Sequence, residues 1–303
     1  MFRTVPLLVL LGFSAWSANL PVREASAPAI IGNRMPAFYN GYLYIAEPLH
    51  VLNLFAPDGH ELFTLPFQGR DNGNIAVESI AIDSDDTLAV AWRDKPNAGI
   101  DIRNLSGTLI RSFDTGRFVP TSLSFGPDHS LWALGWQRDA GRPDYPDRQD
   151  YPIVRKYSID GKELGAYLPR SSFAPGLPPG ILDQSRRITV TSDRVGVDVV
   201  SGKGSRQQEW VELDLTGKVM GRWKLDPSNE HPDVVFTSDD NAYVERYNRE
   251  IKSQQLFRLN HSTSAWELVS AAAGSLYGSD GEQLVFAHFP DRVMHLSWVP
   301  QPK

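Results

Sequence analysis

The sequence predicts an all-β protein, a six-bladed β-propeller whose blades each contain four antiparallel strands. Two observations carry the prediction. A polar turn flanked by apolar strands recurs along the chain, and a second hairpin follows most copies about twenty residues later. Units of roughly 40–50 residues with four short strands are typical of propeller blades. With 303 residues, the chain is long enough to bury the core of one such domain.

The first repeated hairpin is seen most plainly in IAIDSDDTLAVAW, from Ile80 to Trp92. It returns as SLSFGPDHSLWALGW from Ser122, VVFTSDDNAYVERY from Val234 and SLYGSDGEQLVFAHF from Ser275, and more loosely from Ala37 and Ile188. The central turn residues are spaced by 45, 43, 65, 46 and 41 positions, at Asn40, Asp85, Asp128, Asp193, Asp239 and Asp280. Six such turns predict six blades.

The acidic run at 83–87 (DSDDT) has two possible explanations, a calcium site or a chain reversal. It lacks the glycine at position 6 and the glutamate at position 12 of a helix-loop-helix calcium loop. Asp and Ser also hydrogen-bond to their own backbone in tight turns. We therefore expect these side chains to cap the turn between the first two strands of a blade.

The second hairpin supplies the outer two strands of each blade. It reads VLNLFAPDGHELFTL from Val51, IDIRNLSGTLIRSF from Ile100, VRKYSIDGKELGAYL from Val154 and VELDLTGKVMGRW from Val211. A glycine able to take positive φ lies at each turn, and only the fifth copy, from Phe257 to Val269, has none; the four are Gly59, Gly107, Gly161 and Gly217. Each unit thus has strands A, B, C and D in chain order.

The last unit has residues for strands A, B and C, but the chain ends before a fourth strand. A ring closed without that strand would expose an unpaired sheet edge. We expect the apolar segment 27–33 (APAIIGN) to close the sixth blade as its outer strand. The alternative is that the N-terminus of the mature chain is disordered.

The N-terminus itself resembles a targeting segment. One arginine precedes a nine-residue apolar run at 5–13, and small residues follow at 15 and 17. The run is too short to span a bilayer, so we interpret 1–17 as a secretory signal peptide and 18–303 as a single propeller domain. A membrane anchor is the alternative. We expect a secreted or periplasmic monomer without stable membrane insertion after cleavage.

Composition excludes some function classes. The formal charge of −6, from 30 basic and 36 acidic residues, argues against a nucleic-acid partner, which requires clustered Lys and Arg. The chain has no cysteine, so disulfides and thiol chemistry are absent. It also lacks G-x-S-x-G, HExxH and phosphate-loop motifs, which makes a binding protein a better expectation than an enzyme.

The unit SIAIDSDDTLAVAWRDKPNAGIDIRNLSGTLIRSF resembles the NHL repeat of six-bladed propellers, and is similar to TolB-like and gluconolactonase-like propellers. The resemblance covers nearly all of the chain after the signal. The resemblance implies the architecture. It does not imply one function, because this fold includes binding proteins and several classes of enzyme.

Blade topology predicts where a ligand would bind. The A–B and C–D turns are short and share one face, while the long connections, including 137–151 and 169–187, share the other. Long loops on a rigid scaffold commonly carry binding residues, and aromatic residues and Arg are favoured anchors. We expect a protein, peptide or glycan to bind through Trp136, Arg138, Arg142, Tyr145, Arg148, Tyr151, Arg170, Phe173 and Arg187, with no cofactor.

Two alternatives remain open. Gluconolactonase-like propellers hold a divalent metal on Glu, Asn and Asp in the channel, and the resemblance implies Glu78 and Asp233 as two such ligands for calcium or another divalent ion. His231 could join them in a metal-dependent, lactonase-like hydrolase. The second alternative is a structural subunit of an envelope complex.

Overall fold

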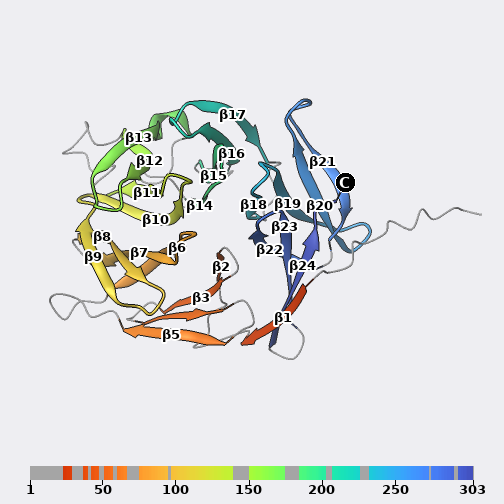
Figure 1. The fold of residues 1–303 in the computed structure, drawn as a ribbon. Coiled ribbons are helices and arrows are strands. Elements are labelled where there is room, and N and C mark those ends of the chain that lie inside the picture. Colours follow the sequence, from red (N-terminus) through yellow and green to blue (C-terminus); the bar gives the residue numbers. More distant parts are fainter. Residues whose placement is uncertain are drawn as a thin grey trace, which may run out of the picture.

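The computed structural model is a ring of six β-sheets around a central axis (Figure 1). It describes residues 23–28, 37–39, 42–47, 51–56, 60–66, 75–94, 97–138, 150–174, 184–202, 207–225, 232–272, 274–289 and 293–302. Within these ranges every sheet has four antiparallel strands, ordered from the axis outwards. The prediction of a six-bladed propeller is therefore confirmed.

The first five blades follow the chain without interruption. Blade one contains β2 (Ala37–Tyr39), β3 (Tyr42–Glu47), β4 (Val51–Phe55) and β5 (Glu61–Pro66). Blade two contains β6 (Ala76–Ile82), β7 (Thr87–Asp94), β8 (Asn97–Asn104) and β9 (Leu109–Asp114). Blade three contains β10 (Phe118–Phe125), β11 (Leu131–Gln137), β12 (Pro152–Tyr157) and β13 (Glu163–Pro169), followed by the short 3-10 helix η2 (Arg170–Ser172).

The second half of the ring has the same order. Blade four contains β14 (Gln184–Val190), β15 (Arg194–Ser201), β16 (Gln207–Asp214) and β17 (Val219–Lys224). Blade five contains β18 (Val234–Phe236), β19 (Ala242–Asn248), β20 (Ser253–Asn260) and β21 (Ala265–Ala271). Blade six contains β22 (Ser275–Asp280), β23 (Gln283–His288), β24 (Val293–Pro300) and, as its outer strand, β1 (Arg23–Pro28).

The N-terminal strand closes the ring, as predicted, but from an earlier segment than 27–33. Strand β1 pairs with β24 from Arg23 opposite Trp298 to Pro28 opposite Val293. The Arg23 guanidinium lies 4.4 Å from the centre of the Trp298 ring and 3.8 Å from an Asp280 oxygen. Outer strands of this propeller are largely exposed, as β9 and β17 show, so apolar character was the wrong guide to the closing strand.

The acidic turn at 83–87 is a backbone-capped hairpin. Asp83 N–H donates to the Thr87 carbonyl at 2.8 Å, and the Asp85 carboxylate accepts from Thr87 N–H at 3.1 Å. Asp86 adopts a φ of 66°, which Asp tolerates better than most residues. The blade-three turn repeats this arrangement, with Gly126 N–H donating to the Ser130 carbonyl. The prediction that these side chains cap the backbone is confirmed.

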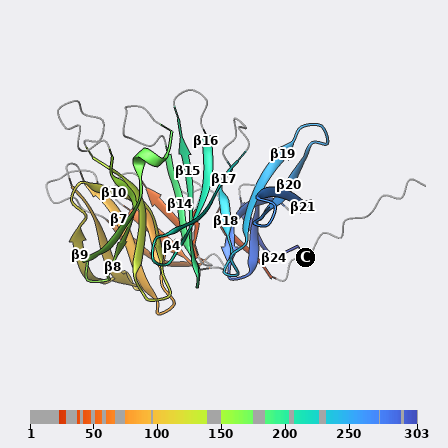
Figure 2. The ribbon, with the colours of Figure 1, turned by 90° about the horizontal axis from the view of Figure 1, so that it is seen from above.

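The outer hairpins follow the glycine pattern. Gly107, Gly161 and Gly217 have φ between 83° and 89°, in the region that glycine enters without a Cβ clash. The fifth copy, which has no glycine, places Ser264 at φ 55° instead. These turns and the A–B turns lie together on the short-turn face of the disk (Figure 2). The B–C and D–A connections lie on the opposite, long-loop face.

Side-chain hydrogen bonds to inner strands connect neighbouring blades, as seen from blade two to blade five. A blade's innermost strand has no strand partner on its channel side, so its N–H groups there need other acceptors. Ser79 Oγ accepts from Leu123 N–H at 3.2 Å, and Ser122 Oγ accepts from Ile188 N–H at 3.0 Å. Asp198, which is fully buried, accepts from Val234 N–H. These bonds fix the inner strands that surround the channel.

Large buried rings fill the spaces between blades. Trp210 of blade four packs edge-on against Phe236 of blade five, with ring centres 5.2 Å apart. Phe38 of blade one packs against Trp298 of blade six in the same way, at 6.2 Å.

Among the described residues, no helix has the length and apolar character needed to cross a membrane.

Candidate ligand-binding site

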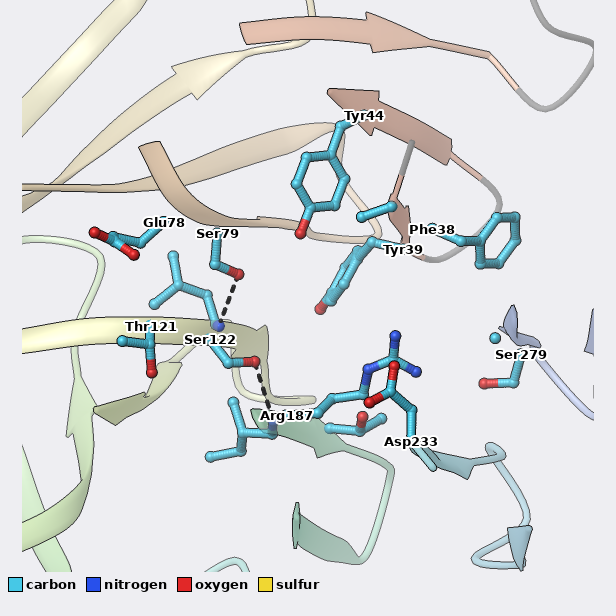
Figure 3. Close-up of a pocket in the computed structure, with 15 residues that line it drawn as sticks. Phe38, Tyr39, Tyr44, Glu78, Ser79, Thr121, Ser122, Arg187, Asp233 and Ser279 are labelled. Atoms are coloured by element: carbon cyan, nitrogen blue, oxygen red, sulfur yellow. Dashed lines mark hydrogen bonds between the residues drawn. The ribbon is translucent and has the colours of Figure 1, made fainter. Parts of the chain in front are cut away.

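A cavity of about 200 Å³ lies in the central channel, and every blade contributes to its wall (Figure 3). Most of its lining comes from the inner strands and their immediate neighbours, and it includes Tyr39, Tyr44, Glu78, Ser79, Ser122, Arg187, Asp233 and Ser279. The cavity lies along the inner strands, on the side of the D–A connections. The A–B turns lie at the other end of these strands. A second hollow, lined by residues of the A–B turns, lies at the short-turn end of the channel.

Repeated β-bulges shape the wall of this cavity. The register of the A and B strands shifts between Val77 and Ser79, between Pro120 and Ser122, between Ser185 and Arg187, and between Leu276 and Gly278. A bulge adds one residue, bends the strand and re-aims the side chains around it. Four blades therefore change direction at the same level of the channel. The residue after each bulge (Ser79, Ser122, Arg187 and Gly278) contributes to the cavity lining.

Two opposite charges from neighbouring blades meet in the cavity. Arg187 extends from β14 of blade four, and Asp233 immediately precedes β18 of blade five. In Figure 3 the guanidinium and the carboxylate extend into the same part of the cavity. Arg187 was predicted to belong to a ligand site on the long-loop face. The structure places it deeper, among the inner strands.

Tyrosine hydroxyl groups surround this pair of charges. Burial raises the pKa of Tyr44, although nearby Arg187 opposes the effect. Burial also raises the pKa of Tyr277 to about 12, with Arg187 acting in the opposite direction and Tyr44 and Asp233 adding to the increase. Tyr39, whose pKa burial raises to about 12, donates to Ser124 Oγ at 3.2 Å. These phenols are neutral at physiological pH and can act as hydrogen-bond donors.

The residues implied as metal ligands do not fit a channel-bound cation. Glu78 Oε1 lies 2.6 Å from Arg93 Nε, so its charge is already matched within blade two. The Asp233 carboxylate extends into the same part of the cavity as the Arg187 guanidinium (Figure 3). A cation at this level would have to compete with two guanidinium groups.

The described residues contain one group of three side chains that could hold a metal ion, and it lies on the short-turn face. Asp83, Asp85 and His129 place their ligand atoms within 4.8 Å of one another. Hydrogen bonding to Asp83 at 2.7 Å raises the pKa of His129, with the charge of Asp83 as the next cause. The contacts of Asp83 and Asp85 with the turn backbone and with His129 account for the cluster without an ion.

Three predicted anchors of the long loops have structural roles. Tyr151 and Phe173 are buried in the core beneath blades three and four. Arg170 is 2% exposed, and its guanidinium donates to the carbonyls of Phe173 and Ala174 at 3.1 and 2.7 Å. The Arg222 guanidinium lies 4.4 Å from the centre of the Phe173 ring. These three side chains therefore hold the base of a loop and are not exposed as ligand anchors.

The other predicted anchors divide into two groups. Trp136 is half-buried against the same core, and half-buried Arg138 donates from Nη2 to the Asn97 carbonyl at 3.2 Å. Both lie at the end of β11 where the connection of blade three begins. Arg142, Tyr145 and Arg148 lie outside the described residues.

Exposed apolar side chains on the long-loop face were missed by sequence reasoning. Tyr247 and Ile251, in the β19–β20 hairpin, are 45% and 60% exposed, and Phe289, just after β23, is 37% exposed. The hairpin is short, so loop length does not indicate it. The signal that could have identified it is an apolar residue, Ile251, inside an otherwise charged turn (NREIKS).

Comparison with solved structures confirms the architecture. The chain is similar to Kuenenia stuttgartiensis hydrazine synthase, with a TM-score of 0.52 and 11% identity over 89% of this chain and 74% of that one. It is similar to a protein of unknown function from Bacteroides caccae, with a TM-score of 0.51 and 12% identity over 82% and 79% of the two chains. At these identities the likeness shows the fold alone.

TolB from Acinetobacter baumannii is also among the similar structures, with a TM-score of 0.48 and 13% identity over 88% of this chain and 65% of that one. No protein-family model and no curated protein matches the chain.

Proposed function

We propose that this protein is an exported binding propeller that takes a protein, peptide or glycan at its long-loop face. The observation that carries the proposal is the difference between the two faces. The described A–B and C–D turns close within a few residues through backbone hydrogen bonds, as Asp83–Thr87 and Asp214–Lys218 do. By contrast, fourteen positions separate β11, ending at Gln137, from β12, beginning at Pro152. Long connections on a rigid scaffold are suited to binding.

The exposed side chains support the same face. Tyr247, Ile251 and Phe289 present apolar surface on the long-loop side of blades five and six. The turns on the opposite face expose mainly polar and acidic groups, among them Asp85 and Asp193. Exposed apolar residues on that side, such as Leu109 and Val219, lie at the starts of the outer strands rather than in the turns. Aromatic and aliphatic groups in contact with a partner contribute more to binding than solvated rim charges. Export is inferred from the signal-like segment 1–17, which lies outside the described residues.

A random-peptide display library and a glycan array, probed with the purified mature protein, test this proposal. Replacing 139–149 with a short Gly-Ser linker should abolish or weaken the hits while the fold remains. The replacement keeps Arg138, whose N–H donates to the Arg117 carbonyl, and Asp150, which accepts from Ser171 N–H at 2.9 Å. Loss of an anchor residue commonly weakens binding by about thirtyfold, corresponding to roughly 2 kcal/mol.

The matched control disturbs the opposite face by replacing Asp85 and Asp239 with alanine together. These residues cap the A–B turns of blades two and five. Stability should fall modestly and the hits should persist. The proposal is overturned if neither screen gives a hit, or if the turn variant loses binding while the loop replacement retains it.

A further inference from the structure

The central cavity contains a charge pattern that the loop face does not explain. Three of its lining residues have acidic or basic side chains, namely Glu78, Arg187 and Asp233. Glu78 is matched by Arg93 of its own blade at 2.6 Å. Arg187 and Asp233 come from different blades and extend into the same part of the cavity (Figure 3). The wall of the cavity therefore includes a guanidinium and a carboxylate from neighbouring blades.

The remainder of the wall is neutral and rich in hydroxyl groups. Tyr44, Ser79, Ser122 and Ser279 line the cavity beside the two charges. Several of these hydroxyls already serve the fold, since Ser122 Oγ accepts from Ile188 N–H and Ser279 Oγ donates to the Phe236 carbonyl at 2.8 Å. Arg187 and Asp233 are thus the groups with the strongest field in the cavity. Charged hydrogen bonds strengthen in such a partly enclosed space.

We infer that this cavity binds a small zwitterion of the α-amino-acid type, with its carboxylate on Arg187 and its ammonium group on Asp233. A guanidinium presents two parallel N–H donors that match a carboxylate, and an ammonium donates to a carboxylate as a point charge. A free amino acid carries both groups on one carbon, at a separation that two facing side chains can reach. The volume of about 200 Å³ is below the range for drug-sized ligands and suits a molecule of this size.

Other ligands satisfy the pattern less well. An anionic sugar would meet Asp233 as a like charge, and a free metal ion would meet Arg187. A neutral molecule would leave both charges to one another and gain little from either. The wall sets no single requirement on the side chain of such a ligand, so amino acids with side chains of different size serve as probes. The inference goes beyond the loop-face proposal, because the cavity can take this ligand whether or not a macromolecule binds above it.

Isothermal titration calorimetry with L-alanine, L-leucine and L-phenylalanine tests the inference, each beside its N-acetyl and C-terminal amide derivatives. At least one free amino acid should bind. Its amide should bind about 10- to 100-fold more weakly, because Arg187 then loses a charged acceptor, and its N-acetyl form should weaken similarly at Asp233. Absence of binding by all three free amino acids, or equal binding by the derivatives, overturns the inference.

Variants assign each charge to its end of the ligand. Asp233→Asn should remove the preference for a free amino group over an acetylated one, and Arg187→Gln should remove the preference for a free carboxylate over an amide. Arg187→Lys, which keeps the charge without the two-pronged donor, should bind with intermediate affinity. Arg111→Gln and Asp193→Asn are the matched controls on the outer strand of blade two and in the blade-four turn, and both should bind as the wild type does.

The other explanation for the two charges is an ion pair that joins blades four and five. In that case the Arg187 and Asp233 variants lower the melting temperature but leave the ligand preferences unchanged, which overturns the inference. Failure of the peptide and glycan screens would overturn the loop-face proposal alone. Separate measurements therefore test the two proposals.

Discussion

Ser124 provides a sharp test of how the blades are joined. This serine lies on β10 and is 2% exposed. Its Oγ accepts from Val190 N–H of blade four at 2.9 Å and from the Tyr39 hydroxyl of blade one at 3.2 Å. Val190 belongs to an innermost strand, so its N–H has no strand partner on that side. Ser124→Ala would leave this buried donor without its acceptor.

The expected cost follows from these contacts. A buried N–H that loses its only acceptor costs about 1–3 kcal/mol. The Tyr39 hydroxyl also interacts with the backbone of Phe125, so its loss is partial. We expect Ser124→Ala to lower the free energy of unfolding by about 2 kcal/mol. For a domain of roughly 280 residues, with an unfolding entropy of about 2.1 cal/mol/K per residue, that corresponds to roughly 3 °C in melting temperature.

Denaturant unfolding followed by tryptophan fluorescence measures this change. Ser192→Ala, in the exposed turn of blade four, is the matched control and should alter stability by no more than about 0.5 kcal/mol. The loss of unfolding free energy in the Ser124→Ala, Tyr39→Phe double variant should be smaller than the sum for the two single variants, because both changes remove the same hydrogen bond. Equal stability of Ser124→Ala and the control would refute the idea that serine hydroxyls join the inner strands.

Three further changes test packing and charge. Gly196→Ala should lower the free energy of unfolding by about 1–3 kcal/mol in denaturant titration, because its Cβ would lie 2.2 Å from the buried Trp210 ring. Burial raises the pKa of Glu245 and outweighs the opposite effect of a hydrogen bond from Leu276 N–H, so the ionised carboxylate lowers the stability of the fold above pH 4.5. Glu245→Gln should therefore have a higher melting temperature than the wild type at pH 7 but not at pH 4. For Asp128, burial is outweighed by hydrogen bonds that lower its pKa from 3.8 to about 2, so its contribution is present above pH 4 and lost toward pH 2. Asp128→Asn should therefore be about 1 kcal/mol less stable than wild type at pH 7, a value reduced for its half-exposed side chain, and calorimetry should show the difference vanish near pH 2.

The repeats were readable because each hairpin is a local structure. Asp83 and Thr87 are four positions apart, and the hydrogen bond between their backbones depends on turn residues between them. The same holds for Gly107 and Gly161, because a glycine in a turn already indicates a residue with positive φ. Six such units leave few alternatives to a closed ring. The need for a closing strand followed from counting strands.

The position of the closing strand was not readable, because its partner lies about 270 residues away. Arg23 is charged, and its residue type gives no indication of strand pairing, yet it stacks on Trp298 at the outer edge of blade six. Similarly, Tyr151 and Phe173 look like surface anchors in a long loop but pack into the core between blades three and four. Aromatic residues serve burial and binding equally well, and only their surroundings distinguish the two.

The sequence by itself determined the number of blades, the order of the strands and the division into a short-turn and a long-loop face. Only the tertiary structure decided that Arg187 and Asp233 share one cavity and that Glu78 is matched by Arg93. The physical reason is range. Turns and strand alternation depend on residues a few positions apart, whereas the channel is formed by six strands that are distant in sequence and meet only when the ring closes.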